Sequence, residues 1–455
     1  MNAVLKQDDG RLYAAHRKVY PREVAGRFQR LRLASTVVLL GLFYAVPWLQ
    51  WRGHQAVLFD LPARKFYIFG LTFFPQDFFL LAWLLIIAAL SLFFFTAIAG
   101  RLWCGYACPQ TVWTGVFVWM ERITEGSRQQ RMKLDAAPWS AGKLARKAAK
   151  QLLWVTFAVA TGVTFVGYFT AIRTLSGFDL HGWEAFWIVF YGFATYGNAG
   201  HLREQVCKYM CPYARFQGAM FDRNTLVISY DAARGDPRGA RSKRVDPRKQ
   251  GLGDCVDCTV CVQACPTGID IRNGLQLECI ACAACIDACD DVMDRLQYPR
   301  GLIRYSTQNA MDGRKTHVVR LRTLIYGALL LALTIGFGVA VHERPLLVLD
   351  VMRDRNALFR VTDMGNIENV YTIRLVNKDS APHTVRLAVD GLAAAVLEGD
   401  RSVYVVDPES VLSATVRIHV PPQRISGGRD IVIRAQSTDE RIDAKSKARF
   451  IGPAS

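Results

Sequence analysis

Eight of the twelve cysteines of this chain lie between residues 255 and 289, and their spacing constrains the fold more than any other feature. The first four follow the pattern C-x2-C-x2-C-x3-C-P, and the next four repeat the spacing. Two-cluster bacterial ferredoxins carry this run, in which three close thiolates and one from the other run hold each [4Fe–4S] cluster. We therefore predict two clusters. The ligands of the first are Cys255, Cys258, Cys261 and Cys289, and those of the second are Cys279, Cys282, Cys285 and Cys265.

The second run departs from the pattern because Asp290, not proline, follows Cys289. The proline shapes the turn rather than binding iron, so we expect Cys289 to remain a ligand. A pair of structural zinc sites is the alternative, but four-cysteine zinc sites usually come as two separated C-x2-C pairs. With all eight thiolates used, no iron is left open for substrate. The predicted role of both clusters is therefore electron transfer.

Five apolar runs indicate that the same chain lies in a membrane. Each is about as long as a helix must be to cross the ~30 Å hydrocarbon layer. Buried helices of a soluble protein are the alternative, but five such runs in one soluble domain would be unusual. Pro47 in the first run, and Glu184 and Asn198 in the fourth, make these two less regular. The runs are 33–51, 78–100, 152–172, 183–200 and 323–341.

Basic residues alternate between the connecting segments and predict their sidedness. Lys and Arg number 8 in residues 1–32, 9 in 101–150 and 19 in 201–322, but 3 in 52–77 and 1 in 173–182. The positive-inside rule then places the N-terminus and the cysteine-rich segment in the cytoplasm of a bacterium. We therefore predict that the chain is anchored in the inner membrane and that its C-terminal segment is periplasmic.

The net charge of +17 is explained by this topology and by anionic lipid, so we predict membrane lipid and no nucleic acid as a partner. The basic stretch 234–250 is interpreted as a linker near the membrane. All cysteines fall on the cytoplasmic side, where thiols stay reduced and serve as ligands or redox groups.

A second cysteine pattern, C-x3-C-P, occurs twice, at the predicted cytoplasmic ends of the second and fourth runs. The copies are offset by 103 residues, and Gly115 in the first flank matches Gly218 in the second. We interpret this as a parallel duplication of a hairpin, which would place both pairs at the same membrane depth. The four cysteines are Cys104, Cys108, Cys207 and Cys211.

Two thiols four residues apart on a helix share one face, and soft thiolate and thioether ligands favour Cu(I). We therefore predict that these four cysteines bind copper, as substrate or bound ion, and form the catalytic set. Met120 and Met210 are weaker candidate ligands, and His201 is a candidate ligand for Cu(II). Three alternatives stay open: packing cysteines, a third iron–sulfur cluster, or a thiol–disulfide pair.

The C-terminal segment alternates apolar and polar residues in short runs separated by turns, which predicts a sandwich of seven or eight strands. The predicted organisation has five parts. These are a basic segment (1–32), a four-helix membrane region (33–222), a linker with the ferredoxin domain (223–322), a fifth transmembrane helix (323–341) and a periplasmic β-sandwich (342–455).

Together these features resemble the CcoG family, also called FixG or RdxA, over the full length of the chain. CPTGIDIRNGLQLECIACAACIDACD is similar to that family's motif. The resemblance implies a multidomain membrane protein with five transmembrane α-helices, an inserted ferredoxin-like domain and a C-terminal all-β immunoglobulin-like sandwich. It also implies cytoplasmic reduction of Cu(II) to Cu(I) by the C-x3-C-P cysteines in support of haem–copper cytochrome c oxidase assembly. Oxidase biogenesis factors and a second copy of the chain are the implied partners.

Two other functions remain open. A respiratory subunit could exchange electrons with membrane quinone, with aromatic residues such as Trp48 and Trp51 lining a site. An assembly scaffold could hold the clusters for structural reasons alone. No flavin or nicotinamide fingerprint is visible, so the electron donor is left unnamed.

Overall fold

The computed structural model divides the chain into two compact units. One comprises Met1–Leu49 and Leu85–Ala332, and the other comprises Gln50–Leu84 and Leu333–Ser455. Residues 1–17 of the basic segment and 242–250 of the basic linker lie outside the described residues. The described residues are 18–177, 182–241, 251–422, 425, 427–438 and 442–453.

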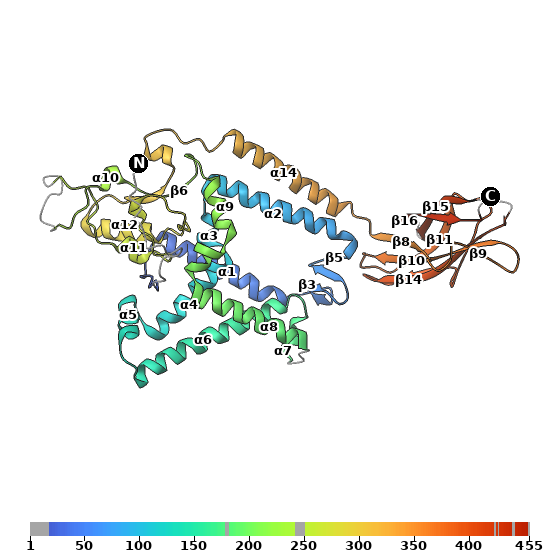
Figure 1. Cartoon of the computed structure of the whole chain (residues 1–455), viewed down its shortest axis with the longest axis horizontal. Helices are drawn as coiled ribbons and strands as arrows, with labels where there is room; N and C mark the ends of the chain where they lie inside the picture. Colours follow the sequence, from blue (N-terminus) through green and yellow to red (C-terminus); the bar gives the residue numbers. More distant parts are fainter. Residues whose placement is uncertain are drawn as a thin grey trace, which may run out of the picture. The chain divides into compact units, whose positions relative to one another are not determined.

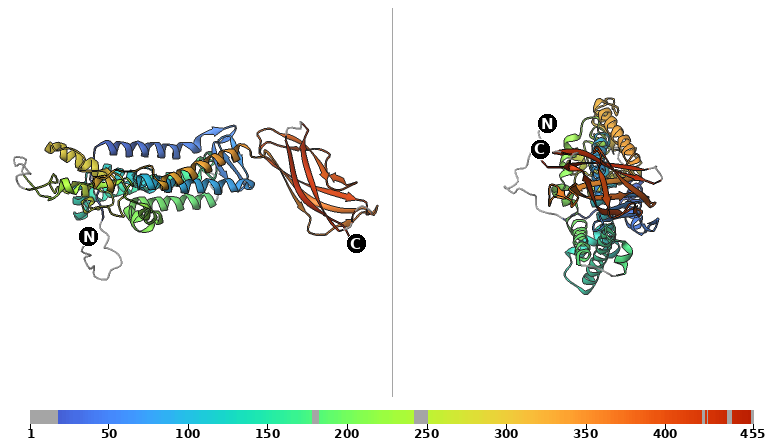
Figure 2. Two further views of the ribbon diagram at one scale, coloured as in Figure 1. Left: turned by 90° about the horizontal axis from the view of Figure 1, so that it is seen from above. Right: turned by 90° about the vertical axis from the view of Figure 1, so that its right-hand side faces the viewer.

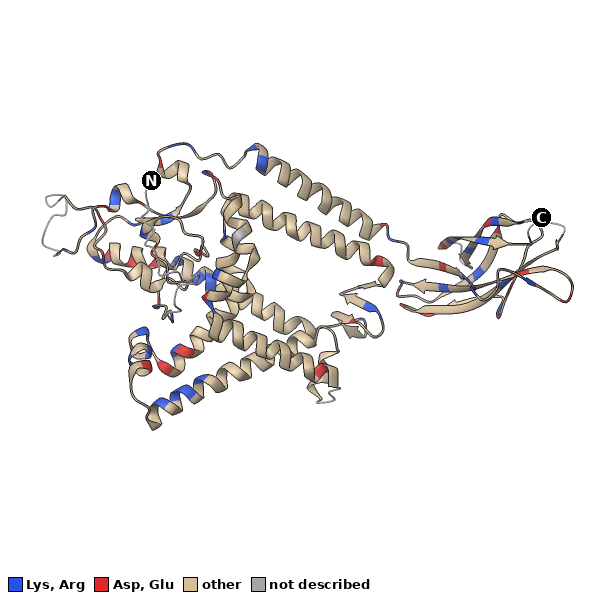
Figure 3. Cartoon of the chain, viewed as in Figure 1, with Lys and Arg blue, Asp and Glu red and all other residues tan. Residues whose placement is uncertain are grey.

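Within the described part of the chain, four helical stretches are long and apolar enough to cross a membrane. In the last stretch, no residue of the most apolar part is buried. In each of the first two stretches, only 6% of the corresponding part is buried. These surfaces are almost free of charge (Figure 3), so lipid is the solvent that suits them. The helices are α1 (Arg27–Ala45, extended by η1, Val46–Trp48), α2 (Phe78–Ala99, preceded by η2, Pro75–Asp77), α6 (Ala141–Val166) and α14 (Leu321–His342).

The fourth predicted run is not one of these stretches. It forms α8 (Gly182–Thr195), which continues as a π-helical segment, η3 (Tyr196–Leu202). The Asn198 carbonyl there accepts from the Arg203 amide at 2.8 Å and from Gln110 Nε2 at 2.8 Å. A polar residue and two glycines in the sequence YGNAGHL explain why the regular helix ends before this point.

Glycines allow neighbouring helices to approach closely. Gly162 of α6 faces Gly192 of α8, and a Cβ built at Gly162 would lie 3.1 Å from the Gly192 amide nitrogen. α14 packs beside α2 (Figure 1), where Phe94 contacts Gly327. Close packing of small residues is the main source of helix association in lipid, where burial of apolar surface gives no net drive.

The cysteine-rich segment forms a small ferredoxin-like domain. Strand β6 (Val227–Tyr230) pairs antiparallel with β7 (Ile303–Ser306), and the cysteine runs lie between them in the sequence. Helix α11 (Val260–Ala264) follows the first two cysteines of the first run and contains the third, and α12 (Ala284–Leu296) holds the end of the second. The buried core includes Ile228, Ile271, Met293, Leu302 and Ile303.

The backbone bends in the same way in both cysteine runs. Asp257 and Thr259 flank the middle cysteine of the first run with φ of 53° and 55°. Ala281 and Ala283 flank the middle cysteine of the second with φ of 54° and 59°. Non-glycine residues rarely adopt this left-handed conformation, and such strain persists where the surrounding structure demands it. The repeated bend curls each run so that its thiols converge.

Asp287 of α12 attaches the ferredoxin-like domain to the first membrane helix. Its carboxylate accepts from the backbone amides of Phe28 and Gln29 at 3.2 and 2.7 Å, and so caps the start of α1. No side chain fits at Gly26, because a Cβ there would overlap the Asp287 carboxylate. A carboxylate at a helix N-terminus satisfies free amides and complements the helix dipole.

The second unit contains the predicted β-sandwich (Figures 1 and 2). One sheet has the order β12-β14-β10-β8, with β9 paired to β10, and the other has the order β13-β11-β15-β16. The strands are β8 (Leu347–Arg353), β9 (Arg360–Val361), β10 (Ile367–Asn377), β11 (His383–Asp390), β12 (Val396–Gly399), β13 (Tyr404–Val406), β14 (Val411–Val420), β15 (Gly428–Ser437) and β16 (Asp443–Ile451).

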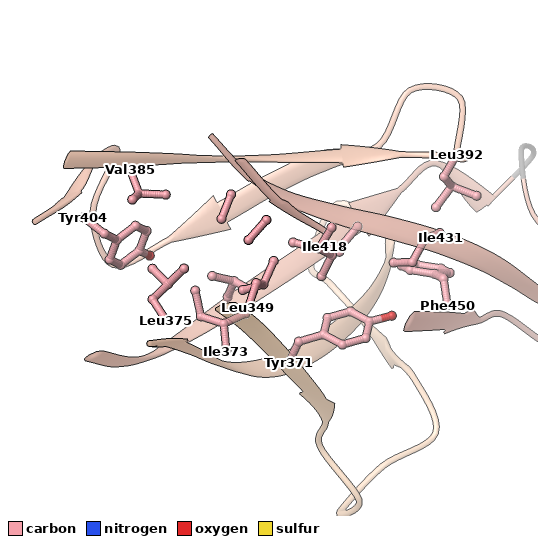
Figure 4. Close-up of a cluster of buried hydrophobic side chains, with 14 of the residues drawn as sticks. Leu349, Tyr371, Ile373, Leu375, Val385, Leu392, Tyr404, Ile418, Ile431 and Phe450 are labelled. Atoms are coloured by element: carbon pink, nitrogen blue, oxygen red, sulfur yellow. The ribbon is translucent and has the colours of Figure 1, made fainter. Parts of the chain in front are cut away.

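Alternating side chains of the two sheets meet in an apolar core (Figure 4). Tyr371 and Ile373 of β10 face Ile431 of β15 and Phe450 of β16, and all are at most 1% exposed. The Tyr371 hydroxyl, buried with its ring, donates to the Arg449 carbonyl at 3.0 Å. The period-two pattern that predicted this domain is therefore the pattern that buries its core.

A three-stranded sheet precedes α2 in the same unit and contacts the sandwich. Asp77 forms an ion pair with Lys378 at 2.6 Å, with both side chains almost fully buried. The Thr72 hydroxyl donates to Glu409 at 2.7 Å. The strands are β3 (Val57–Asp60), β4 (Lys65–Ile68) and β5 (Leu71–Phe73).

Candidate iron–sulfur and thiol site

The eight cysteines of the ferredoxin-like domain surround two small cavities. Arg272 and Met293 complete the wall of one, and Ile228 and Ile269 lie in the wall of the other. Cys261 lines both. The first cavity is lined by Cys255, Cys258, Cys261 and Cys289, and the second by Cys265, Cys279, Cys282 and Cys285.

The structure thus brings together the two sets of four that the crossed pattern predicts. Four sulfur donors facing one apolar hollow suit an iron–sulfur core, which is held by thiolates and tuned by its burial. Burial raises the pKa of Cys261 to about 11 and that of Cys289 to about 12. Thiolates so placed need a cationic partner, and the donor set therefore fits the two predicted clusters.

Asp290 takes the position that proline holds in the first run. Its carboxylate accepts from the Gly301 amide at 2.9 Å, and this bond fixes the turn after Cys289. Burial raises the pKa of Asp290 despite that bond. The departure from the pattern therefore changes what shapes the turn, while Cys289 still faces the first cavity.

The two C-x3-C-P pairs begin new helices in both copies. Cys108 caps α4 (Pro109–Glu125), and Cys211 caps α9 (Pro212–Met220). Cys104 lies in the short helix α3 (Leu102–Tyr106), which ends before Cys108, and Cys207 lies in the π-helical segment η4 (Val206–Met210). The expectation that both cysteines of a pair share one helix is wrong, because proline at the first helical position starts a separate helix.

The tertiary fold nevertheless gathers the four cysteines, which we call the thiol quartet: Cys104, Cys108, Cys207 and Cys211. Burial, with repulsion from the other three thiolates, raises the pKa of Cys104 to about 12, although Arg101 opposes it. Burial likewise raises the pKa of Cys207 to about 11. In the part of the chain that the structure describes, no three His, Cys, Asp or Glu side chains are spaced for a single metal ion.

The thiol quartet lies directly against the second cysteine run. Cys104 and Cys207 pack on a buried cluster that contains Ile280 and Cys282. At Gly105, a Cβ would lie 2.8 Å from the Ala281 carbonyl oxygen and 2.8 Å from the Cys282 Cα. Only glycine permits so close an approach of two backbones. One of the predicted second-cluster ligands is therefore in the same packing cluster as thiols from both repeats.

Arg101 braces this junction, and the sequence patterns did not single it out. Its buried guanidinium donates to the carbonyl oxygens of Leu277, Cys279 and Ala214, so it joins the ferredoxin-like domain to the second repeat. Arg32 of α1 similarly donates to the Cys282 carbonyl. An arginine three residues before Cys104 was the signal that could have pointed to it.

Gln217 is a second residue that sequence reasoning missed. It is fully buried, and its Oε1 lies 3.3 Å from Cys104 Sγ of the other repeat. Its Nε2 lies 3.4 Å from Thr96 Oγ1. A glutamine with no exposed surface beside a thiol orients that thiol, and the signal was its place six residues after Cys211.

The three weaker candidate ligands are placed differently from the thiol quartet. Met120 lies in an apolar core with Phe117 and Trp154. The His201 ring contacts the rings of Trp154 and Tyr196 at 5.7 and 4.9 Å. Met210, between the cysteines of the second pair, is 58% exposed. Only Met210 stays beside the thiol quartet in the sequence.

Comparison with known proteins assigns the chain at the level of its domains. A 4Fe–4S dicluster domain matches residues 202–308, and a 4Fe–4S binding domain matches residues 81–125. The IG-like fold at the C-terminus of FixG matches residues 337–453. The nitrogen fixation protein FixG of Rhizobium meliloti (strain 1021) is 39% identical and covers 95% of this chain and 92% of its own length. This chain belongs to the FixG/RdxA family.

Two further relatives agree with this assignment. Protein RdxB of Cereibacter sphaeroides is 40% identical over 95% of this chain and 93% of its own length, and protein RdxA is 41% identical over 84% of each. A crystal structure of a FixG-related protein from Vibrio parahaemolyticus is 28% identical and covers 24% of this chain and 97% of its own, with a TM-score of 0.22, and no argument rests on it. The FixG/RdxA member described here is an iron–sulfur electron-transfer protein of the membrane.

Proposed function

We propose that this protein reduces Cu(II) to Cu(I) at the thiol quartet, with electrons delivered from the iron–sulfur groups of the ferredoxin-like domain. The observation that carries the proposal is the packing of Cys104 and Cys207, one from each repeat, against Cys282. Groups for storing electrons and soft ligands for a metal substrate are thereby next to each other.

The two sets of cysteines have different roles in this proposal. The eight cysteines of the two runs would hold two [4Fe–4S] clusters, which when bound supply one-electron storage and transfer. The thiol quartet would bind copper as substrate. Metal-binding thiols must be deprotonated, so copper would displace the protons that burial otherwise keeps on Cys104 and Cys207. One electron per copper ion produces Cu(I), the softer ion that thiolates prefer.

A third iron–sulfur cluster at the thiol quartet is the second candidate, and one observation favours it. The 4Fe–4S binding domain that matches residues 81–125 includes Cys104 and Cys108. Four thiols from two repeats would suffice for one further cluster. In that case the thiol quartet would extend the electron path, and copper would be reduced elsewhere or not at all.

The placement of the chain in the cell follows from the same proposal. By the positive-inside rule, the basic segments support a cytoplasmic ferredoxin-like domain and a periplasmic β-sandwich, an arrangement that requires an odd number of crossings. α8 and η3 together supply the fifth crossing. Support of haem–copper oxidase assembly, contact with oxidase biogenesis factors and homodimer formation are further parts of this proposal, and they follow only from what the resemblance to the CcoG family implies.

The double variant Cys104→Ser/Cys207→Ser tests the assignment of the thiol quartet. Full-length protein is purified without oxygen, and iron content, cluster absorbance, affinity for Cu(I) against a chelator and Cu(II) reduction are measured. We expect unchanged iron and absorbance, lost Cu(I) affinity and lost copper reduction. Met132→Leu, which removes a half-exposed thioether of α5 (Arg128–Ala136), is the control and should change none of the four readouts.

Two results would contradict the proposal. Loss of about one-third of the iron in the double variant would assign a third cluster to the thiol quartet, since each cluster holds four irons. Copper reduction at the wild-type rate with intact clusters would show that the reaction does not use these thiols.

A further inference from the structure

A cavity of about 530 Å³ lies beside Cys207 of the thiol quartet. Its walls come from α1, from α4 and from the second cysteine run. Leu33, Val37 and Leu40 of α1 form part of its apolar wall, and Leu33 and Val37 are more than half exposed. Because α1 is one of the membrane-crossing stretches, an occupant can enter this cavity from the lipid.

The duplication shows that this space is specific to one repeat. Gly115 of α4 and Gly218 of α9 are equivalent positions, offset by the same 103 residues as the cysteines. Over Gly218 the space is taken, because a Cβ there would lie 2.6 Å from Leu277 Cδ2 of the ferredoxin-like domain. Over Gly115, which lines the cavity, no atom lies within 4 Å of such a Cβ. The ferredoxin-like domain fills one half of a pseudo-symmetric pair and leaves the other open.

Redox groups lie on the wall of the open half. Cys207 of the thiol quartet and Cys282 of the second cysteine run both line the cavity. A ligand that fills this volume therefore contacts the predicted electron path at two points. Cavities of this size bind small organic molecules when a mostly apolar wall carries a few polar groups.

Polar groups are present at the same wall. Thr36 and Thr114 carry hydroxyls that can donate to a ligand oxygen, and Arg122, paired with Glu23 at 2.7 Å, adds a cation. A lipid-soluble ring with an oxygen at each end suits a cavity whose wall combines apolar side chains of α1 with these few polar groups. We propose that this cavity binds a membrane quinol and is the place where the quinol donates electrons to the iron–sulfur groups.

The inference rests on the proposed electron-transfer function and supplies its electron donor. A quinol that gives up two electrons and two protons becomes a quinone. Its two electrons would pass to two one-electron acceptors, the iron–sulfur groups that the eight cysteines would hold. Its two protons pass to water near Glu23, whose side chain is 47% exposed.

Gly115→Leu tests the site, because leucine would extend into the cavity where glycine leaves room. Full-length protein in liposomes is photolabelled with an azidoquinone, and labelled peptides are identified by mass spectrometry. Anaerobic reduction of the clusters by a short-chain quinol is followed in parallel. Gly338→Leu on α14, where a Cβ also meets no atom within 4 Å, is the matched control. Val37→Phe fills the cavity from the opposite wall.

We expect wild type and Gly338→Leu to label on the α1 and α4 peptides. In Gly115→Leu and Val37→Phe, labelling and quinol-driven reduction should both fall about tenfold, because the added side chain occupies the ligand volume. Dithionite must still reduce all variants, and dithionite-reduced variants must still reduce Cu(II), so failure of the proposed copper chemistry is seen separately. Labelling elsewhere, equal labelling in the filled variants, or labelling without cluster reduction would overturn the quinol site.

Discussion

The two cysteine regions of this protein are built in different ways. Each cavity of the ferredoxin-like domain takes its four cysteines from two adjacent runs, bent at matching positions by residues such as Thr259 and Ala283. The thiol quartet takes only two thiols from each repeat and forms when helices distant in the sequence meet. A locally encoded, enclosed set of ligands suits a cofactor that stays. A set assembled between repeats, beside an open cavity, suits an ion that is exchanged.

The largest expected effect is a loss of iron from the ferredoxin-like domain. Cys282→Ala removes a ligand from the second cavity, so about half of the iron should be lost, since two clusters share it equally. Cu(II) reduction should be abolished as well. Iron analysis and electron paramagnetic resonance of full-length protein measure the loss. Full iron occupancy in Cys282→Ala would show that the crossed assignment of ligands is wrong.

The second-largest effect concerns Arg101, whose hydrogen bonds join the two regions. Arg101→Leu removes a buried guanidinium that donates to three backbone carbonyls and should lower the free energy of unfolding by about 2–3 kcal/mol. Arg101→Lys keeps the charge but not the fork of donors, so it should recover only part of this loss. Thermal unfolding in lipid nanodiscs measures both. Equal stability of Arg101→Leu and wild type would show that Arg101 does not hold the two regions together.

The cap on the first membrane helix should contribute less. Asp287→Ala frees two amides of α1 and should cost about 1 kcal/mol. Ser140→Ala is the matched control, because Ser140 caps α6 from its own chain segment through the Lys143 amide. Hydrogen exchange at residues 27–32 should rise only in Asp287→Ala. The same exchange in both variants would mean that α12 does not hold α1.

The smallest effect concerns the contact between repeats. Gln217→Leu keeps the volume but removes the oxygen near Cys104 Sγ, and should lower stability by about 0.5–1 kcal/mol. Thr114→Val, at the equivalent position of the other repeat, lines the open cavity and should cost less. Thermal unfolding of the two variants compares the closed and open halves. A larger loss for Thr114→Val would reverse the assignment of which half is packed.

Local patterns in the sequence predicted the parts of this protein that local physics determines. Cysteine spacing identified the eight residues that line the two cavities, and apolar length identified four of the membrane helices. Period-two alternation identified the sandwich. Proline at the first helical position also explains why Cys104 and Cys108 do not share a helix, although the i, i+4 argument overlooked it.

Contacts between distant segments could not be predicted in the same way. Arg101 reaches Leu277, and Asp287 reaches Phe28, because the ferredoxin-like domain packs on the membrane helices. Nothing in the neighbouring sequence of either residue encodes its partner. The same holds for Leu277 over Gly218, which closes one half of the duplicated site. α8 gives way to the π-helical segment η3 because of Asn198 and the glycines beside it. This change could not be predicted from the apolar run, because it depends on the groups that donate to the Asn198 carbonyl, one of them from a distant segment.

The central claim is that electrons held in the ferredoxin-like domain leave to copper at the thiol quartet. The direct measurement reduces the clusters without oxygen, removes excess reductant, adds one equivalent of Cu(II), and follows cluster reoxidation while a chelator traps Cu(I). The account predicts one Cu(I) for each electron lost, with a rate at least about tenfold lower in Cys104→Ser/Cys207→Ser, equivalent to about 1.4 kcal/mol in the barrier. Clusters that stay reduced beside unreacted Cu(II) would contradict it.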